Sequence, residues 1–282
     1  MTLKTLRSRV PHLLTAVLML LGLMTAATAQ AQATPQRTTA SATICSNSPI
    51  PSGWVVTSSY STSGCPGTGY AYTITDTSTL SNATVCSFSP IPAGWVVTSS
   101  YATSGCAGTG YAYTLAKITT QTSATVCSFS PIPTGWVVTS SYSTSGCAGT
   151  GYAYTLANTA NLSNATVCSF SPIPTGWVAT SSYSTSGCAG TGYAYTLANT
   201  ANLSSATVCS FSPIPTGWVV TSSYATSGCA GTGYAYTLAK ITTQTSATVC
   251  SFSPIPSGWV VTGSYSTSGC AGSGYAYTIR KA

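Results

Sequence analysis

The sequence predicts an all-β protein of six tandem 41-residue repeats of β-hairpin type, each clipped by a disulfide. Three observations predict this class. Two cysteines recur at fixed places in each block, short runs alternate large and small residues, and no segment shows a helical period. Two arrangements stay open, either separate beads or a stacked, solenoid-like array. We expect the repeats at 42–82, 83–123, 124–164, 165–205, 206–246 and 247–282.

The N-terminal segment, residues 1–33, is expected to be a secretory signal peptide. Basic residues open it, an apolar run follows at 13–23, and Ala-x-Ala cleavage sites stand at 27–29 and 31–33. A membrane anchor is the alternative, but the apolar run is short for a bilayer. We therefore expect an exported chain with a Thr-rich leader at 34–41 and no membrane span after cleavage. Its place would be extracellular, at the cell surface or in the periplasm.

The remaining chain is nearly uncharged. Its formal net charge falls from +7 to about +4, because three cations leave with the signal. Nucleic-acid binding needs clustered Lys and Arg, so we expect no nucleic-acid partner. The only acid is Asp76, and the cations are Arg37, Lys117, Lys240, Arg280 and Lys281.

The cysteines frame each block. The first of each block are Cys45, Cys86, Cys127, Cys168, Cys209 and Cys250, and the second are Cys65, Cys106, Cys147, Cys188, Cys229 and Cys270. Pairing within a block leaves no free thiol, whereas pairing across blocks strands Cys45 and Cys270. We favour pairing within the block, which contributes roughly 3 kcal/mol to a unit too small to bury much core. With no C-x-x-C and no histidine after the signal, we expect neither metal nor cofactor.

The second block begins with a short strand at 83–86. The Pro-Ile-Pro segment at 90–92 is then expected to be a stiff, extended connector that ends in a turn at Gly94, because proline fixes φ and lacks a donor.

Two longer strands follow at 95–101 and 111–115, and a turn with three glycines joins them. Folded as an antiparallel hairpin, they are expected to have an aromatic side and a small polar side. Alternation places on the aromatic side Trp95, Val97, Tyr101, Tyr111, Tyr113 and Leu115.

One substitution bears on the choice between beads and a stack. Asn47 stands in the first block where the others have Phe88, Phe129, Phe170, Phe211 and Phe252. A first block has no predecessor, so a polar residue suits a terminal cap and favours Phe packing against the preceding block. Drift in one copy is the alternative. At the other end, Arg280 and Lys281 are expected to discourage further edge pairing.

The segments between blocks contain neither Gly nor Pro and are of two kinds. One kind covers 116–123 and recurs from Ala239, and the other covers 157–163 and recurs from Ala198. Lys117 and Lys240 are expected to be solvated charges in these linkers.

Catalysis is not expected, and no catalytic residue is assigned. After the signal the chain has no histidine and no glutamate, so it lacks a carboxylate pair and the base of a Ser-His-Asp site. The aromatic side chains form either the small core or rings that stack on sugars. We favour the core for the tryptophans and, less strongly, for the paired tyrosines. The candidate stacking residues are Trp54, Tyr70, Tyr72, Trp95, Tyr111, Tyr113, Trp136, Tyr152, Tyr154, Trp177, Tyr193, Tyr195, Trp218, Tyr234, Tyr236, Trp259, Tyr275 and Tyr277.

One stretch of the repeat resembles a known kind of module. Cys45, the segment Pro-Ile-Pro-Ser-Gly-Trp-Val-Val at 49–56, the pair Gly64-Cys65 and the later Tyr-x-Tyr-Thr-Ile resemble a two-cysteine module of secreted bacterial proteins. The resemblance covers residues 42–282. It implies export and a modular chain, and it adds no site.

These observations favour a non-enzymatic secreted or cell-surface protein with a structural, matrix or adhesive role, in which self-association is one expectation. The alternative is a multivalent polysaccharide- or cell-wall-binding protein that uses exposed Tyr and Trp, since weak sites on one chain gain avidity. A remote alternative is ice binding through rows of Thr98 and Thr114, although the threonine spacing does not follow T-x-T.

Overall fold

The computed structural model describes residues 39–282. The predicted signal peptide, residues 1–33, and the first residues of the predicted leader lie outside the described residues. In the described part the chain forms six repeats of three β-strands, and no helix there is able to span a membrane. The predicted all-β class and the six tandem disulfide-clipped repeats are confirmed.

Every repeat holds three strands in the same order. The first strands are β1 (Ser41–Cys45), β4 (Asn82–Cys86), β7 (Ser123–Cys127), β10 (Asn164–Cys168), β13 (Ser205–Cys209) and β16 (Ser246–Cys250). The second strands are β2 (Trp54–Ser61), β5 (Trp95–Ala102), β8 (Trp136–Ser143), β11 (Trp177–Ser184), β14 (Trp218–Ala225) and β17 (Trp259–Ser266). The third strands are β3 (Tyr70–Asp76), β6 (Tyr111–Lys117), β9 (Tyr152–Asn158), β12 (Tyr193–Asn199), β15 (Tyr234–Lys240) and β18 (Tyr275–Lys281).

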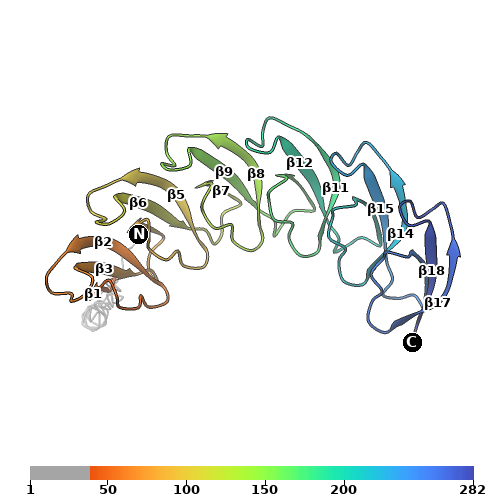
Figure 1. Ribbon diagram of the computed structural model, residues 1–282, viewed down its shortest axis with the longest axis horizontal. Helices are drawn as coiled ribbons and strands as arrows, with labels where there is room; N and C mark the ends of the chain where they lie inside the picture. The colour runs from red at the N-terminus through yellow and green to blue at the C-terminus, as the bar shows by residue number, and fades with distance from the viewer. Residues whose placement is uncertain (1–38) are drawn as a thin grey trace, which may run out of the picture. The chain divides into compact units, whose positions relative to one another are not determined.

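The third strand lies in the middle of each three-stranded sheet (Figure 1). In the second repeat the order is β4-β6-β5, and both pairs are antiparallel. The predicted hairpin of β5 and β6 is therefore present, and β4 completes the sheet on the other side of β6. Because β6 has a partner on each side, only β4 and β5 keep an outer edge that is able to meet a neighbouring repeat.

A β-bulge interrupts the second strand of every repeat. In β5 the register shifts between Val97 and Ser99, so that Val97 lies opposite Leu115 but Tyr101 lies opposite Ala112. The extra residue of a bulge reverses the alternation of side chains beyond it. The prediction that Val97 and Tyr101 share one face of the sheet is therefore wrong.

The Pro-Ile-Pro connector ends in a tight turn before the second strand. In the second repeat the Trp95 N–H donates to the Pro92 carbonyl at 3.1 Å, and Gly94 has a φ of 78°. This left-handed conformation is costly for any residue with a Cβ, which explains the glycine. The turn predicted at Gly94 is confirmed.

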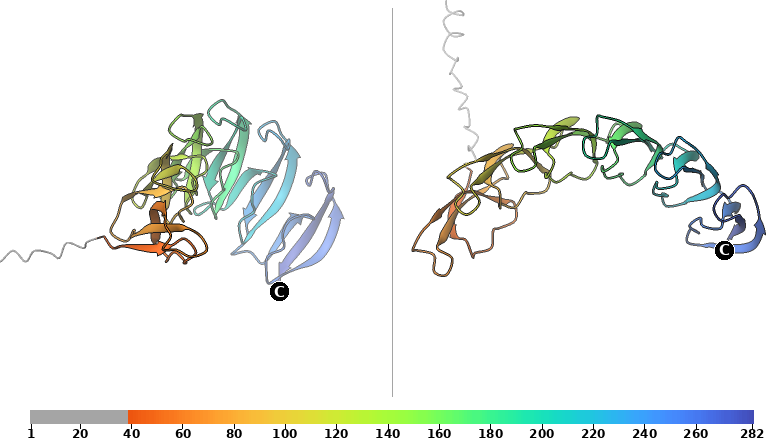
Figure 2. Two further views of the ribbon diagram at one scale, coloured as in Figure 1. Left: turned by 60° about the vertical axis from the view of Figure 1, so that its left-hand side comes forward. Right: turned by 45° about the horizontal axis from the view of Figure 1, so that its top comes forward.

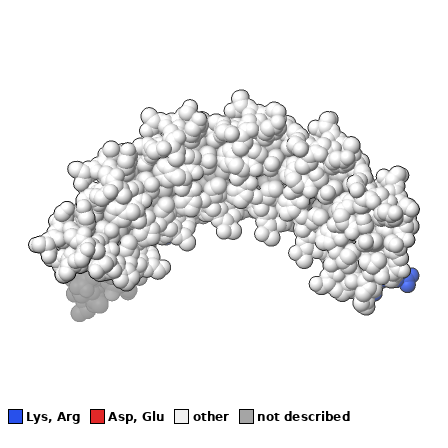
Figure 3. Space-filling view, in the orientation of Figure 1, with Lys and Arg blue, Asp and Glu red and all other residues white. Residues whose placement is uncertain are grey.

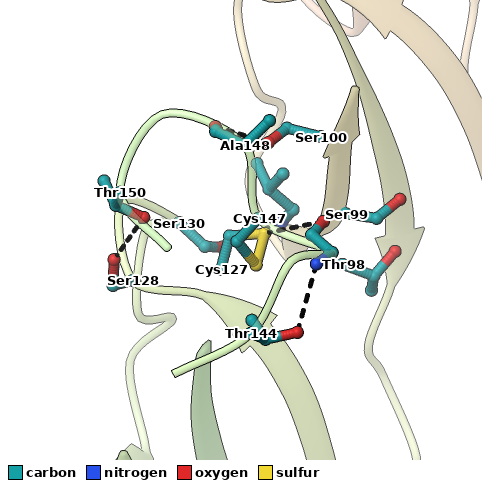
Figure 4. The surroundings of a disulfide bond; sticks show 12 residues. Thr98, Ser99, Ser100, Cys127, Ser128, Ser130, Thr144, Cys147, Ala148 and Thr150 are labelled. Carbon is teal, nitrogen blue, oxygen red and sulfur yellow. Dashed lines mark hydrogen bonds between the residues drawn. A yellow bond between two sulfur atoms is a disulfide. The ribbon is translucent and has the colours of Figure 1, made fainter. Parts of the chain in front are cut away.

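Each repeat is closed by a disulfide between its own two cysteines, which lie 20 residues apart. The bond clips the end of the first strand to the hairpin loop, as Figure 4 shows for Cys127 and Cys147. The predicted pairing within the repeat is confirmed. Six such bonds indicate an oxidising environment such as the extracellular space.

Neighbouring repeats are joined by hydrogen bonds at a serine of the second strand. Ser59 N–H donates to the Gly105 carbonyl at 3.0 Å, and its hydroxyl donates to the Ala107 carbonyl at 2.8 Å. Ala107 N–H returns a bond to the Ser59 carbonyl at 3.3 Å. The same three bonds recur at the junction serines Ser100, Ser141, Ser182 and Ser223.

A second serine crosses each junction in the opposite direction. The Ser89 hydroxyl of the second repeat accepts the Val56 N–H of the first at 2.8 Å, beside the bulge of β2. Both residues are buried, so the bond satisfies an amide that the bulge leaves without a strand partner. Equivalent bonds are accepted by Ser130, Ser171, Ser212 and Ser253.

Apolar contacts complete the junctions. Phe88 packs against Tyr72 of the preceding repeat with ring centroids 5.0 Å apart, and Phe129 packs against Tyr113 at 4.9 Å. The prediction that these phenylalanines pack on the preceding repeat is confirmed. Figure 2 shows the neighbouring repeats side by side in chain order in both views. Neighbours are therefore bonded to one another through their sheets as well as through the chain.

The segments between repeats also belong to the packed structure. Lys117 is the last residue of β6 and is half-buried, so its predicted place in a solvated linker is wrong, and Lys240 ends β15 in the same way. The next residue, Ile118, is buried, and its N–H donates to the Gly94 carbonyl at 3.0 Å. The segment is thereby tied to the turn that precedes β5.

Candidate functional site

A surface pocket recurs between neighbouring repeats, where two Pro-Ile-Pro connectors approach each other. Between the second and third repeats it has a volume of about 580 Å³, and its lining includes Pro92 and Trp95 from one repeat and Pro133 and Trp136 from the next. Equivalent pockets of about 490 Å³ and about 550 Å³ lie at the fourth-to-fifth and fifth-to-sixth junctions. Ile, Pro and Trp make up much of each wall, so the pockets suit apolar groups.

At the end of the third strand, the residue opposite each tryptophan varies among the repeats. These residues are Asp76, Lys117, Asn158, Asn199, Lys240 and Lys281. Three of them also line a pocket, namely Asn158, Lys240 and Lys281. Apart from Arg280, every charged side chain within residues 39–282 stands at this position. The pockets therefore share walls of Ile, Pro and Trp, and the residue opposite the second tryptophan is Asn158 in one pocket and a lysine, Lys240 or Lys281, in the other two. On the face drawn in Figure 3, Lys and Arg appear only at the last repeat.

Asp76 holds the turn that follows β3. Its carboxylate accepts the Ser78 hydroxyl at 2.7 Å and the Ser78 N–H at 3.0 Å. These bonds, the hydroxyl bond first, lower the pKa of Asp76 because they stabilise its charged form. Asn158 and Asn199 accept the same backbone bond from the residue two positions on, at 3.0 and 2.9 Å. The carboxylate thus has a structural task that an amide also performs.

The candidate tryptophans lie mostly in the core. Trp95, Trp136, Trp177 and Trp218 are 2–5% exposed, and Trp54 and Trp259 of the terminal repeats are half-buried. A ring that is enclosed in this way offers little surface for stacking. These side chains therefore stabilise the junctions, and only their rims are available to the pockets.

The candidate tyrosines fall into two groups. The first tyrosine of each pair is 38–56% exposed, as in Tyr70, Tyr111, Tyr152, Tyr193, Tyr234 and Tyr275. The second is half-buried, as in Tyr72, Tyr113, Tyr154, Tyr195, Tyr236 and Tyr277, and the first five of these pack against the phenylalanine of the next repeat. The structure thus leaves one open ring per repeat from the predicted pair.

A second row of exposed tyrosine rings was not among the predicted stacking residues. The tyrosines that follow the bulge are 43–49% exposed, namely Tyr60, Tyr101, Tyr142, Tyr183, Tyr224 and Tyr265. Alternation without the bulge places Tyr101 on the inward side with Val97. No signal in the sequence marks the bulge itself, since Thr98 and Ser99 are ordinary strand residues in this repeat.

The threonines considered for ice binding are engaged within their own sheet. The Thr98 hydroxyl donates to the Thr114 carbonyl at 3.2 Å, and the Ser99 hydroxyl bonds to the Thr114 hydroxyl at 2.9 Å. Both threonines are half-buried. Their hydroxyl groups therefore serve the bulge and its partner strand.

Within residues 39–282, no three His, Cys, Asp or Glu side chains lie together as a metal site requires. All the cysteines are in disulfides, so no thiol is available as a nucleophile or ligand. No protein-family model, curated protein or solved structure matches this chain. The absence of catalysis stays a prediction.

Proposed function

We propose that this chain is a non-enzymatic secreted or cell-surface protein with a structural or adhesive role. The observation that carries the proposal is the repetition of one bonded junction five times between six disulfide-clipped repeats. Each junction combines three hydrogen bonds at a strand edge, one bond to a serine hydroxyl beside a bulge, and one contact between a phenylalanine and a tyrosine ring. Such an array keeps its exposed side chains at regular intervals, which is useful to a scaffold.

The composition of the surface supports the same role. It is rich in Ser, Thr and Tyr and holds few charges, so it favours contacts through hydrogen bonds and flat rings over electrostatic steering. The disulfides suit an extracellular location, where a small repeat would otherwise have little core to hold it together.

The experiment compares cells that make the protein with cells that lack it. The expected result is that the chain is recovered outside the cell or on its surface, and that its loss weakens attachment to surfaces or the cohesion of the extracellular matrix. Recovery of the oxidised chain only inside the cell, or unchanged attachment and cohesion, would contradict the proposal.

A second candidate function is multivalent binding of a glycan or cell-wall polymer. The two rows of exposed tyrosines favour it, because each repeat presents one ring from the Tyr101 row and one from the Tyr111 row. Weak stacking sites that recur on one chain add up through effective concentration.

The two functions are separated by retention of the oxidised protein on insoluble peptidoglycan or chitin. The binding function predicts retention that falls stepwise as Tyr111 and its equivalents are changed to Ser, first in one repeat and then in all six. Tryptophan fluorescence should stay unchanged in these variants, since Trp95 and most of its equivalents are buried away from the substituted rings. Absence of retention by the unaltered protein would remove this second candidate.

A further inference from the structure

Within residues 39–282, the sixth repeat presents a junction edge that no other repeat covers. Val96 and Val97 are 0% exposed in the second repeat, whereas their equivalents Val260 and Val261 are 48% and 47% exposed. Ser264 stands at the place of the junction serines and is exposed, and within residues 39–282 nothing makes the junction bonds to it. We name Val260, Val261 and Ser264 the tail surface. It combines an apolar patch with unpaired strand-edge donors.

The five internal junctions show what fits such an edge. At the second repeat, the N–H and hydroxyl of Ser100 bond to the carbonyls of Gly146 and Ala148 at 3.0 and 2.8 Å, and Ala148 N–H returns a bond at 3.4 Å. Phe129 from the same incoming repeat packs on Tyr113. The partner of this edge is therefore a repeat whose hairpin loop offers an alanine N–H and whose phenylalanine ring packs on the second tyrosine of the preceding repeat.

The head of the chain lacks both of these groups. Pro66 stands in the first repeat where the other five have the alanine, and proline has no N–H to donate. Asn47 stands there in place of the phenylalanine and is exposed. Both departures fall on the surface that a preceding repeat contacts, whereas Gly64, which supplies the acceptor carbonyl, keeps its identity. The first repeat thus lacks both the N–H donor and the aromatic ring of this interface, and both losses weaken its docking onto a preceding repeat.

We propose that the tail surface docks a 41-residue repeat of another protein chain, and that this repeat has Phe and Ala at the positions equivalent to Asn47 and Pro66. In this chain, Asn47 and Pro66 prevent the first repeat of a second copy from docking there. The internal junction then continues from one chain to the next. A head-to-tail contact that does not close on itself grows into filaments. Pro66 and Asn47 thus keep the tail available for a different chain and prevent endless growth.

The first test converts the head into an internal repeat in the oxidised chain that begins at residue 34. The probe is the double variant Asn47→Phe/Pro66→Ala, which uses residues that the other five repeats hold at these places. Sedimentation velocity at several protein concentrations is expected to give one chain per particle for the unaltered protein and concentration-dependent oligomers for the double variant.

A third substitution shows whether the oligomers use the tail. Ser264→Pro removes the edge N–H and the hydroxyl together, and proline is tolerated on an edge strand where the N–H faces away from the sheet. Adding it to the double variant is expected to restore single chains. A folded double variant that stays monomeric, oligomers that persist with Ser264→Pro, or oligomers of the unaltered protein that Ser264→Pro abolishes would each overturn the proposal.

The reverse exchange tests the same residues without any oligomer. Phe170→Asn/Ala189→Pro gives the fourth repeat the two residues of the head and should loosen its junction with the third repeat. Hydrogen exchange of the Ser141 amide, which donates to the Gly187 carbonyl at 2.9 Å, is expected to speed up by about tenfold or more. Unchanged exchange at Ser141 would show that these residues do not govern docking and would overturn the proposal.

Discussion

Replacing Ser130 with alanine tests the bond that fills the bulge at a junction. Ser130 is 6% exposed, and its hydroxyl accepts the N–H of Val97, which is 0% exposed, at 2.9 Å. Alanine takes the same space without the acceptor, so a buried donor loses its partner at a cost of about 1–3 kcal/mol. Since each 1.4 kcal/mol is about a factor of ten, protection of the Val97 amide against hydrogen exchange should fall about 5- to 150-fold.

Hydrogen exchange followed by NMR is the suitable assay, because repeat arrays open locally and a single global unfolding energy does not describe them. Ser48 occupies the same place in the first repeat, which has no preceding repeat to bond. Ser48→Ala is therefore the matched control and should leave the protection of every junction amide unchanged. Equal losses in both variants, or no loss in Ser130→Ala, would refute the assignment of this hydroxyl to the junction.

Three further outcomes are expected. Changing Cys127 and Cys147 together to alanine should lower the free energy of local unfolding of the third repeat by roughly 3 kcal/mol, and unchanged protection in that repeat would contradict this. By hydrogen exchange within the substituted repeat, Gly94→Ala should cost about 1 kcal/mol through its φ of 78° alone, since no atom lies within 4 Å of the added Cβ. Gly263→Ser, which restores the serine of the other repeats, should cost nothing measurable by the same assay. Because the pKa of Asp76 is lowered in the folded chain, its contribution to stability is fully present above the unfolded pKa of 3.8. That contribution is lost as the pH falls through the lower folded pKa. Because the single histidine lies in the predicted signal peptide, stability should be flat between about pH 5 and about pH 8, and a transition inside that window would be inconsistent with this reasoning.

The repeat period made most of the fold predictable. Constant cysteine spacing allowed one pairing that leaves no free thiol, and the alternation in 95–101 and 111–115 placed two strands to within two residues of their observed ends. The change from Phe to Asn47 in the first repeat correctly indicated that Phe88 meets the preceding repeat. These features depend on local pattern or on comparison between copies, which one chain with six repeats supplies.

The features that escaped prediction depend on contacts between segments. The bulge between Val97 and Ser99 turns Tyr101 outward, and nothing in the local sequence requires an extra residue there. The core was the favoured prediction for the tryptophans, but the sequence did not distinguish Tyr113, which packs against Phe129 of the next repeat, from Tyr111, which stays exposed. Burial at a junction is set by the packing of two repeats, so the composition of one repeat did not reveal it.

Disulfide mapping of the oxidised chain tests most directly whether each repeat is clipped by its own bond and joined to its neighbours by non-covalent contacts. Chymotrypsin releases residues 61–70, a peptide that Pro66 distinguishes from its equivalents in the other repeats. The predicted result is that this peptide is linked to the one that contains Cys45. A link to the peptide that contains Cys86, or a free thiol at Cys65, would contradict it.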